Sequence, residues 1–185
     1  MGNLRKDFIS ERFVIINQNK SQKPKSKKNP YKPGNESMTK PSVLSLVEKD
    51  GMLQRLQDDE DNFVKNWCVR VFPASDPSVT IDADNSYTDH PLYSEPAYGY
   101  HYIVVATADE KETLSTMNQE QWGMVLSVIQ DRLRWLYTQK GVAYVAIYGN
   151  HGKEARVDVM HPHLHMMSFS TIPPKIEEEA DFSHR

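Results

Sequence analysis

One long helical segment between runs of β-branched residues restricts this chain to few folds. Across residues 118–141 the apolar side chains recur with the period of a helix that buries one stripe. These side chains are Trp122, Val125, Leu126, Ile129, Leu133, Leu136 and Tyr137. Asn118 is a good N-cap, Gln121 completes a capping box, and Gly141 marks the expected end of the helix. The segment therefore predicts one long helix that packs by a single face.

Short apolar runs on both sides of this helix are typical of strands. The expected strands are residues 12–17, 67–73, 100–107, 142–150 and 161–169. Residues 41–56 fit either a short helix or a pair of strands. Strands grouped before and after a single helix predict an α+β fold, in which one long helix packs on an antiparallel sheet. A length of 185 residues suits a single domain.

Composition limits the classes of partner. The formal net charge of −3 gives no reason to expect nucleic acid, and no apolar run is long enough to span a membrane. The single cysteine, Cys68, fits a reducing compartment, so we expect a cytoplasmic protein. A lysine-rich segment at about residues 18–40 is interpreted as a flexible connector or as a basic flap that closes over phosphates.

The stretch "HPHLHMMSF" at residues 161–169 holds three of the seven histidines. Strand alternation places His161, His163 and His165 on one face. A purely structural role is disfavoured, because three buried neutral imidazoles each need hydrogen-bond partners and charged ones repel. Two functional interpretations remain. The imidazoles bind zinc, with strain because their Cα atoms lie roughly 6.5–7 Å apart, or one of them attacks phosphorus while its neighbours orient it.

Four segments carry further information: "RKDFISERFVII", "NPYKPGNES", "VRVFPASDPSV" and "IYGNHGKEARVDVMHPHLH". In this order they resemble the galactose-1-phosphate uridylyltransferase branch of the histidine-triad superfamily. The resemblance runs from about residue 5 to residue 174 and covers only the first half of those transferases. It implies a single histidine-triad-like (HIT-like) domain over residues 1–185. A single domain of this kind is expected to pair as a homodimer, and an unpaired sheet edge gives a physical reason for association.

The resemblance also implies an enzymatic mechanism. His163 would attack the α-phosphorus of a nucleotide sugar or dinucleoside polyphosphate and form a nucleotidyl-histidine. His161 would orient His163 or neutralise charge on the phosphate, and His165 would bind phosphoryl oxygens or protonate the leaving group. The family's hydrolases have histidine at this third position and its transferases have glutamine, so His165 favours water as acceptor. The expected substrate-binding residues are Asn150, Arg156 and Arg70.

Departures from the family pattern concern its zinc site. The zinc-binding cysteines of the family fall on Asn29 and Lys32, and a histidine ligand falls on Glu110, which leaves His161 alone. Zinc prefers thiolate and imidazole ligands, so no metal and no other cofactor is expected. A family asparagine that contacts the nucleoside falls on Ala74. These losses keep two alternatives open: a catalytically weak module that binds or senses a nucleotide, and a structural or metal-storing protein.

Overall fold

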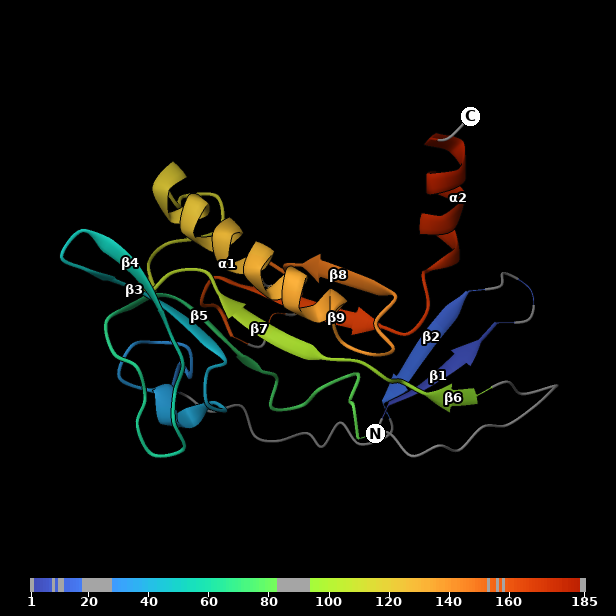
Figure 1. The fold of residues 1–185 in the computed structure, drawn as a ribbon, viewed down its shortest axis with the longest axis horizontal. Coiled ribbons are helices and arrows are strands. Elements are labelled where there is room, and N and C mark those ends of the chain that lie inside the picture. Colours follow the sequence, from blue (N-terminus) through green and yellow to red (C-terminus); the bar gives the residue numbers. More distant parts are fainter. Residues whose placement is uncertain are drawn as a thin grey trace.

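The computed structural model describes residues 2–7, 9, 12–17, 28–82, 94–152, 154–155, 157 and 159–183. Two antiparallel sheets and two helices make up this part of the chain (Figure 1). The long helix α1 lies across the larger sheet, and the smaller sheet lies beyond one end of it (Figure 1). No helix among these residues is long and apolar enough to cross a membrane.

The larger sheet has six strands in the order β4-β3-β5-β7-β9-β8, all of them antiparallel. Its strands are β3 (Leu44–Lys49), β4 (Met52–Leu56), β5 (Trp67–Pro73), β7 (His101–Val105), β8 (Tyr144–Tyr148) and β9 (His163–Phe169). The smaller sheet contains β1 (Gly2–Lys6), β2 (Phe13–Asn17) and β6 (Ser94–Pro96). The predicted α+β class with an antiparallel sheet is therefore confirmed.

The ambiguous residues 41–56 form the strand pair β3–β4. A two-residue turn connects them, and both of its residues have positive φ, 54° at Asp50 and 73° at Gly51. This is the backbone that a tight hairpin requires, and Asp-Gly is a favoured sequence for it. The turn chemistry, which the apolar pattern alone does not reveal, therefore decides between helix and hairpin.

Helix α1 (Gln119–Tyr137) begins where the capping signal predicted, and the Asn118 side chain accepts a hydrogen bond from the Gln121 N–H at 2.8 Å. The predicted stripe was partly wrong, because Leu126 and Tyr137 are 58% and 54% exposed. The buried residues are Val125, Val128, Ile129, Arg132 and Leu136, which lie three or four residues apart on one face. The helix also ends before Gly141, which lies in the turn that follows.

The two faces of the six-stranded sheet have different coverings. On one face Val71, Val104 and Met166 pack in the core that includes α1. On the other face Phe72 and Val105 belong to a second, smaller cluster. Cross-strand pairing of Val105 with His163 and of Ile103 with His165 places both histidines on this second face.

Part of the lysine-rich segment covers the second face. Residues 18–27 lie outside the described residues, whereas 28–40 form turns and the short 3-10 helix η1 (Glu36–Met38). The buried Glu36 carboxylate accepts hydrogen bonds from Lys65, the Trp67 indole and the Gly34 N–H. Burial opposes its ionisation, but these hydrogen bonds outweigh burial and lower the pKa of Glu36 to about 2. Residues 28–40 are thus attached to the domain rather than free.

Candidate functional site

The three motif histidines lie at the start of β9, between β7 and β8. His161 and His163 are buried, and His165 is half-buried. Strand pairing begins at His163, so His161 directly precedes the strand. The rings of His163 and His165 lie next to each other, with centroids 5.2 Å apart. The His161 ring instead forms hydrogen bonds to Asn29 and to the Thr107 carbonyl oxygen.

Hydrogen bonding defines the tautomer of His163. Its Nδ1 lies 2.7 Å from the carbonyl oxygen of His161, and a carbonyl oxygen only accepts, so Nδ1 carries the proton. Among the described residues none bonds to Nε2, which keeps its lone pair. Burial lowers the pKa of His163, although the bond to the carbonyl partly offsets this effect. His163 is therefore a neutral imidazole at pH 7 with a nucleophilic nitrogen.

A fourth histidine, which sequence reasoning missed, contacts His165. The Ser78 N–H donates to Nδ1 of His101 at 3.2 Å, so the proton of the His101 ring is on Nε2. That Nε2–H donates to Nδ1 of His165 at 3.0 Å, which places the His165 proton on Nε2. His101 is the first residue of an apolar strand, where a polar side chain is unusual. This place in the sequence was the signal that could have identified it.

His161 is bound on both ring nitrogens. Its Nε2–H donates to the Thr107 carbonyl oxygen at 2.7 Å, and its Nδ1 accepts from the Asn29 side-chain amide at 3.1 Å. The Asn29 oxygen accepts from the Tyr31 N–H at 3.0 Å, which fixes the orientation of the amide. Burial lowers the pKa of His161. His161 therefore acts through its backbone carbonyl, which orients His163, while its ring anchors the turn at residues 29–35.

The four positions at which the resembled family has its zinc ligands do meet in space, and their chemistry does not suit zinc. Asn29 bonds to His161, and the Lys32 ammonium lies 2.7 Å from the Glu110 carboxylate. The hydrogen bond from Lys32 lowers the pKa of Glu110, so this residue is a paired carboxylate. An amide, an ammonium group and an imidazole nitrogen that is already hydrogen-bonded are not a zinc ligand set. In the described residues no group of three His, Cys, Asp or Glu side chains could hold a metal ion.

Aromatic residues surround the pair of His163 and His165. The Tyr31 ring meets the His163 ring edge-on at 5.1 Å, and the Tyr148 ring stacks on His165 at 5.1 Å. Tyr31 also contacts Phe72 on the same face of the sheet. Because Tyr31 lies in the turn that Asn29 anchors, the hydrogen bond from Asn29 to His161 also holds one wall of the site.

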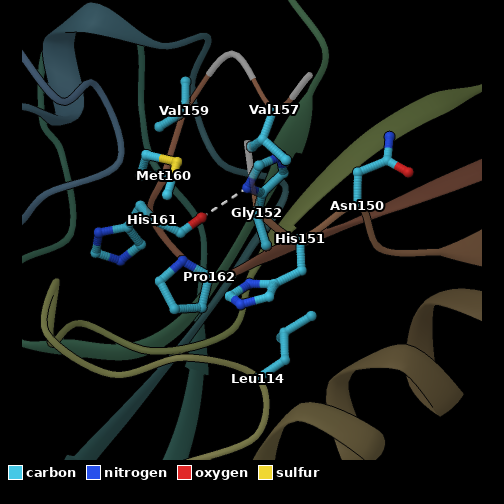
Figure 2. Close-up of a pocket in the computed structure, with 10 residues that line it drawn as sticks. Leu114, Asn150, His151, Gly152, Val157, Val159, Met160, His161 and Pro162 are labelled. Atoms are coloured by element: carbon cyan, nitrogen blue, oxygen red, sulfur yellow. Dashed lines mark hydrogen bonds between the residues drawn. The ribbon is translucent and has the colours of Figure 1, made fainter. Parts of the chain in front are cut away.

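A small cavity adjoins His161 and His163. It is lined by Leu114, Asn150, His151, Gly152, Val157, Val159, Met160, His161, Pro162 and His163 (Figure 2). The dashed line in Figure 2 is the hydrogen bond between His161 and His163. Asn150 is exposed, and its amide points away from the labelled His161 ring (Figure 2). Asn150 therefore lies at the edge of the site, and Arg156 lies outside the described residues.

Arg70 has a different environment from the one expected of a substrate-binding residue. It is 1% exposed, and its guanidinium donates to Asp58 at 2.6 Å and to Thr39 at 2.7 Å. Arg70 pairs with Val105, and Val105 pairs with His163 on the next strand. Arg70 therefore lies two strands from His163, so their Cα atoms are roughly 10 Å apart at the usual strand spacing. The described contacts of Arg70 are therefore structural.

Comparison with known proteins identifies what the chain is similar to. A model of the galactose-1-phosphate uridyl transferase N-terminal domain matches residues 62–173. An ADP-glucose phosphorylase from Arabidopsis thaliana is 22% identical over 184 residues, which cover 96% of this chain and 51% of that protein. A galactose-1-phosphate uridylyltransferase from Thermotoga maritima is 32% identical over 87 residues, 47% of this chain and 27% of that enzyme. The chain thus spans about half the length of these relatives or less.

Solved structures share the fold. A uridylyltransferase structure superimposes with a TM-score of 0.73 at 22% identity and covers all of this chain and 50% of its own. A structure of the Arabidopsis thaliana ADP-glucose phosphorylase with bound ADP-glucose gives a TM-score of 0.66 at 20% identity, and the match covers 98% of this chain and 53% of that one. At these identities the likeness concerns the fold, which is the HIT-like α+β fold expected from the sequence.

Proposed function

Because the chain belongs to the galactose-1-phosphate uridyl transferase family, a branch of the histidine-triad superfamily, we propose that it is a nucleotidyl hydrolase or transferase acting on nucleotide sugars or dinucleoside polyphosphates. The observation that carries the proposal is the state of His163: its Nδ1 proton is bound to the His161 carbonyl, and its Nε2 is unprotonated. The printed names of the relatives, a phosphorylase of ADP-glucose and a uridylyltransferase, support a nucleotide sugar as substrate.

The reaction would proceed in two displacements. In the first, Nε2 of His163 bonds to the α-phosphorus as the bond from phosphorus to the bridging oxygen breaks, and the electron pair leaves with that oxygen. The His161 carbonyl, which accepts from Nδ1–H, stabilises the positive charge that develops on the ring. In the second displacement an oxygen of water, phosphate or a sugar phosphate bonds to phosphorus as the phosphorus–nitrogen bond breaks. The electron pair returns to Nε2, so His163 leaves as neutral imidazole, and an attacking water releases its proton to the solvent.

Detection of the covalent intermediate tests this mechanism. The protein is incubated with ADP-glucose, UDP-glucose or a dinucleoside polyphosphate without phosphate or sugar phosphate, quenched in base after a short time, and digested for mass spectrometry. We expect a nucleotidyl group on the peptide that contains His163, and we expect acid to remove it because phosphorus–nitrogen bonds to histidine are acid-labile. Binding of these nucleotides without any adduct would replace this mechanism by the alternative, a nucleotide-binding or sensing module with weak catalysis.

We propose further that the site works without a metal ion. Asn29, Lys32 and Glu110 form hydrogen bonds and an ion pair where zinc ligands would stand. We therefore expect metal analysis to find no stoichiometric zinc and a chelator to leave both turnover and Tm unchanged. One zinc per chain in purified protein would contradict the prediction. The triple variant Asn29→Cys, Lys32→Cys, Glu110→His serves as a positive control, because with His161 it offers zinc two thiolates and two imidazoles.

We propose a cytoplasmic location, which the single cysteine favours.

We also propose that the chain assembles as a homodimer. Strand β8 is an edge of the six-stranded sheet, and Ile147 on it is 36% exposed. Unpaired edges favour association with a second strand. Light scattering is expected to give about twice the 21.3 kDa mass of one chain. The variant Ile147→Glu should shift the mass toward one chain, whereas wild-type protein that stays at one chain mass at all concentrations would contradict the prediction.

A further inference from the structure

The third histidine of the motif, His165, is hydrogen-bonded to His101, a residue that takes no part in the two displacements described above. His101 of β7 lies across the sheet from β9, and its Nε2 is 3.0 Å from Nδ1 of His165. His101 is buried, at 9% exposure, and Nδ1 of its ring faces the Ser78 N–H. Because a backbone N–H can only donate, the direction of both hydrogen bonds follows: Ser78 to His101, and His101 to His165.

The direction of these two hydrogen bonds disfavours protonation of His165 on both ring nitrogens. An imidazolium at position 165 would carry N–H on both nitrogens, and its Nδ1–H would face the Nε2–H of His101 at hydrogen-bond distance. Two donors cannot satisfy one another, and reversal of the His101 ring proton would leave the Ser78 N–H without its acceptor. The described rings around His165 are His101, His163 and Tyr148, and none of them carries a negative charge that would stabilise an imidazolium.

We propose that His101 is a positioning residue that holds His165 as a neutral hydrogen-bond donor with its proton on Nε2. This inference rests on the proposed function. A neutral Nε2–H does what a glutamine side-chain amide does: it donates a hydrogen bond and transfers no proton. Burial, and then the proximity of His163, lower the pKa of His165 to about 4, in agreement with this state.

A neutral donor suits both displacements of the proposed mechanism. In the first, the bridging oxygen leaves on a phosphate group, which is stable as an anion at neutral pH and needs no proton from His165. In both, the Nε2–H of neutral His165 can hydrogen-bond to the phosphoryl oxygens.

Two pairs of variants test the role of the hydrogen bonds. His165→Gln keeps an N–H donor near the place of Nε2, and His165→Leu has none. We expect kcat on ADP-glucose or UDP-glucose with phosphate to fall at least about tenfold further in the leucine variant than in the glutamine variant. His101→Gln keeps the N–H that faces His165, and it should recover most of the roughly tenfold loss expected in His101→Leu. Equal losses in the glutamine and leucine variants of His165 would overturn the proposal.

NMR spectroscopy of ¹⁵N-labelled histidines tests the tautomer without reference to activity. The wild-type spectrum is expected to show His165 protonated on Nε2 alone and without titration above about pH 5, while His101→Leu should give a mixture of tautomers. A proton on Nδ1 of His165 in the wild type would overturn the proposal. Failure to detect an adduct on His163 would instead reject the proposed function and leave the NMR result standing.

Discussion

Replacement of His163 by asparagine is expected to lower kcat on a nucleotide sugar by at least about a thousandfold, the scale of loss when a covalent nucleophile is removed. Asparagine is the informative choice. Its side-chain amide can occupy the place of Nδ1 and still donate to the His161 carbonyl, a bond of 2.7 Å in the wild type, but nothing replaces the Nε2 lone pair. The measurement is the single-turnover and steady-state rate of nucleotide-sugar cleavage.

Folding of the variant separates lost chemistry from lost structure. Because the hydrogen bond to the carbonyl is retained, Tm of His163→Asn should stay close to that of the wild type while turnover disappears. A variant that keeps more than about a tenth of the wild-type kcat would remove His163 as nucleophile. The adduct expected in the wild type should be missing from the variant, since no other described imidazole offers a free unprotonated nitrogen beside His165.

The pH dependence gives the same assignment a second test. Burial lowers the pKa of His163 below the ordinary value, so Nε2 stays unprotonated through neutral pH and becomes protonated only as the pH falls well below 6.5. The acid limb of kcat/KM is therefore expected below pH 6.5.

The lowered pKa values of His161, His163 and His165 also make the stability of the fold decrease toward acid pH. Unfolded histidines bind protons first, so stability falls as the pH drops from about 6.5 toward the lowered pKa values of the folded protein.

Periodicity located the long helix and five of the nine strands in the described residues, whereas β1, β6 and the second helix, α2 (Pro174–Ser183), were not predicted. The run at 67–73 became strand β5 with the same bounds, and the capping residues at 118 and 121 located the start of α1. The apolar stripe of the helix was less reliable, because Leu126 is one position from the buried Val125 and thus turned away by about 100°. Residues 41–56 remained ambiguous until turn chemistry at Asp50 and Gly51 was considered.

The site was harder to predict, because its function depends on partners far away in the sequence. Spacing identified His163 and His165, but the tautomer of His165 depends on His101, 64 residues away. In the same way Asn29 reaches His161 across 132 residues. For Arg70 the expected role and the environment differ: substrate binding was expected, whereas its guanidinium forms an ion pair with the buried Asp58. A residue's type limits what it can do, and only its neighbours determine which of these roles it has.

The pair of Arg70 and Asp58 leads to the largest expected effect on stability. Their side chains are 2% and 0% exposed, and the carboxylate also accepts from the Ser42 and Val64 N–H groups. Burial alone would raise the pKa of Asp58, but hydrogen bonds from Arg70 and these N–H groups lower it. Arg70→Met would leave a buried unpaired carboxylate, so we expect the free energy of unfolding to fall by about 3–5 kcal/mol in urea denaturation.

Two matched variants make this prediction specific. Arg55→Met makes the same change at the more exposed pair of Arg55 and Asp131, whose side chains are 48% and 30% exposed, and should cost less than about 1 kcal/mol. Addition of Asp58→Asn to Arg70→Met removes the buried charge, so the double variant should be less destabilised than the sum of its single variants. Since Asp58 is ionised in the folded protein down to low pH, the loss in Arg70→Met should be full at pH 7 and shrink as the pH falls and Asp58 gains a proton. A difference of less than about 1 kcal/mol between Arg70→Met and Arg55→Met would show that Arg70 does not stabilise the fold through Asp58.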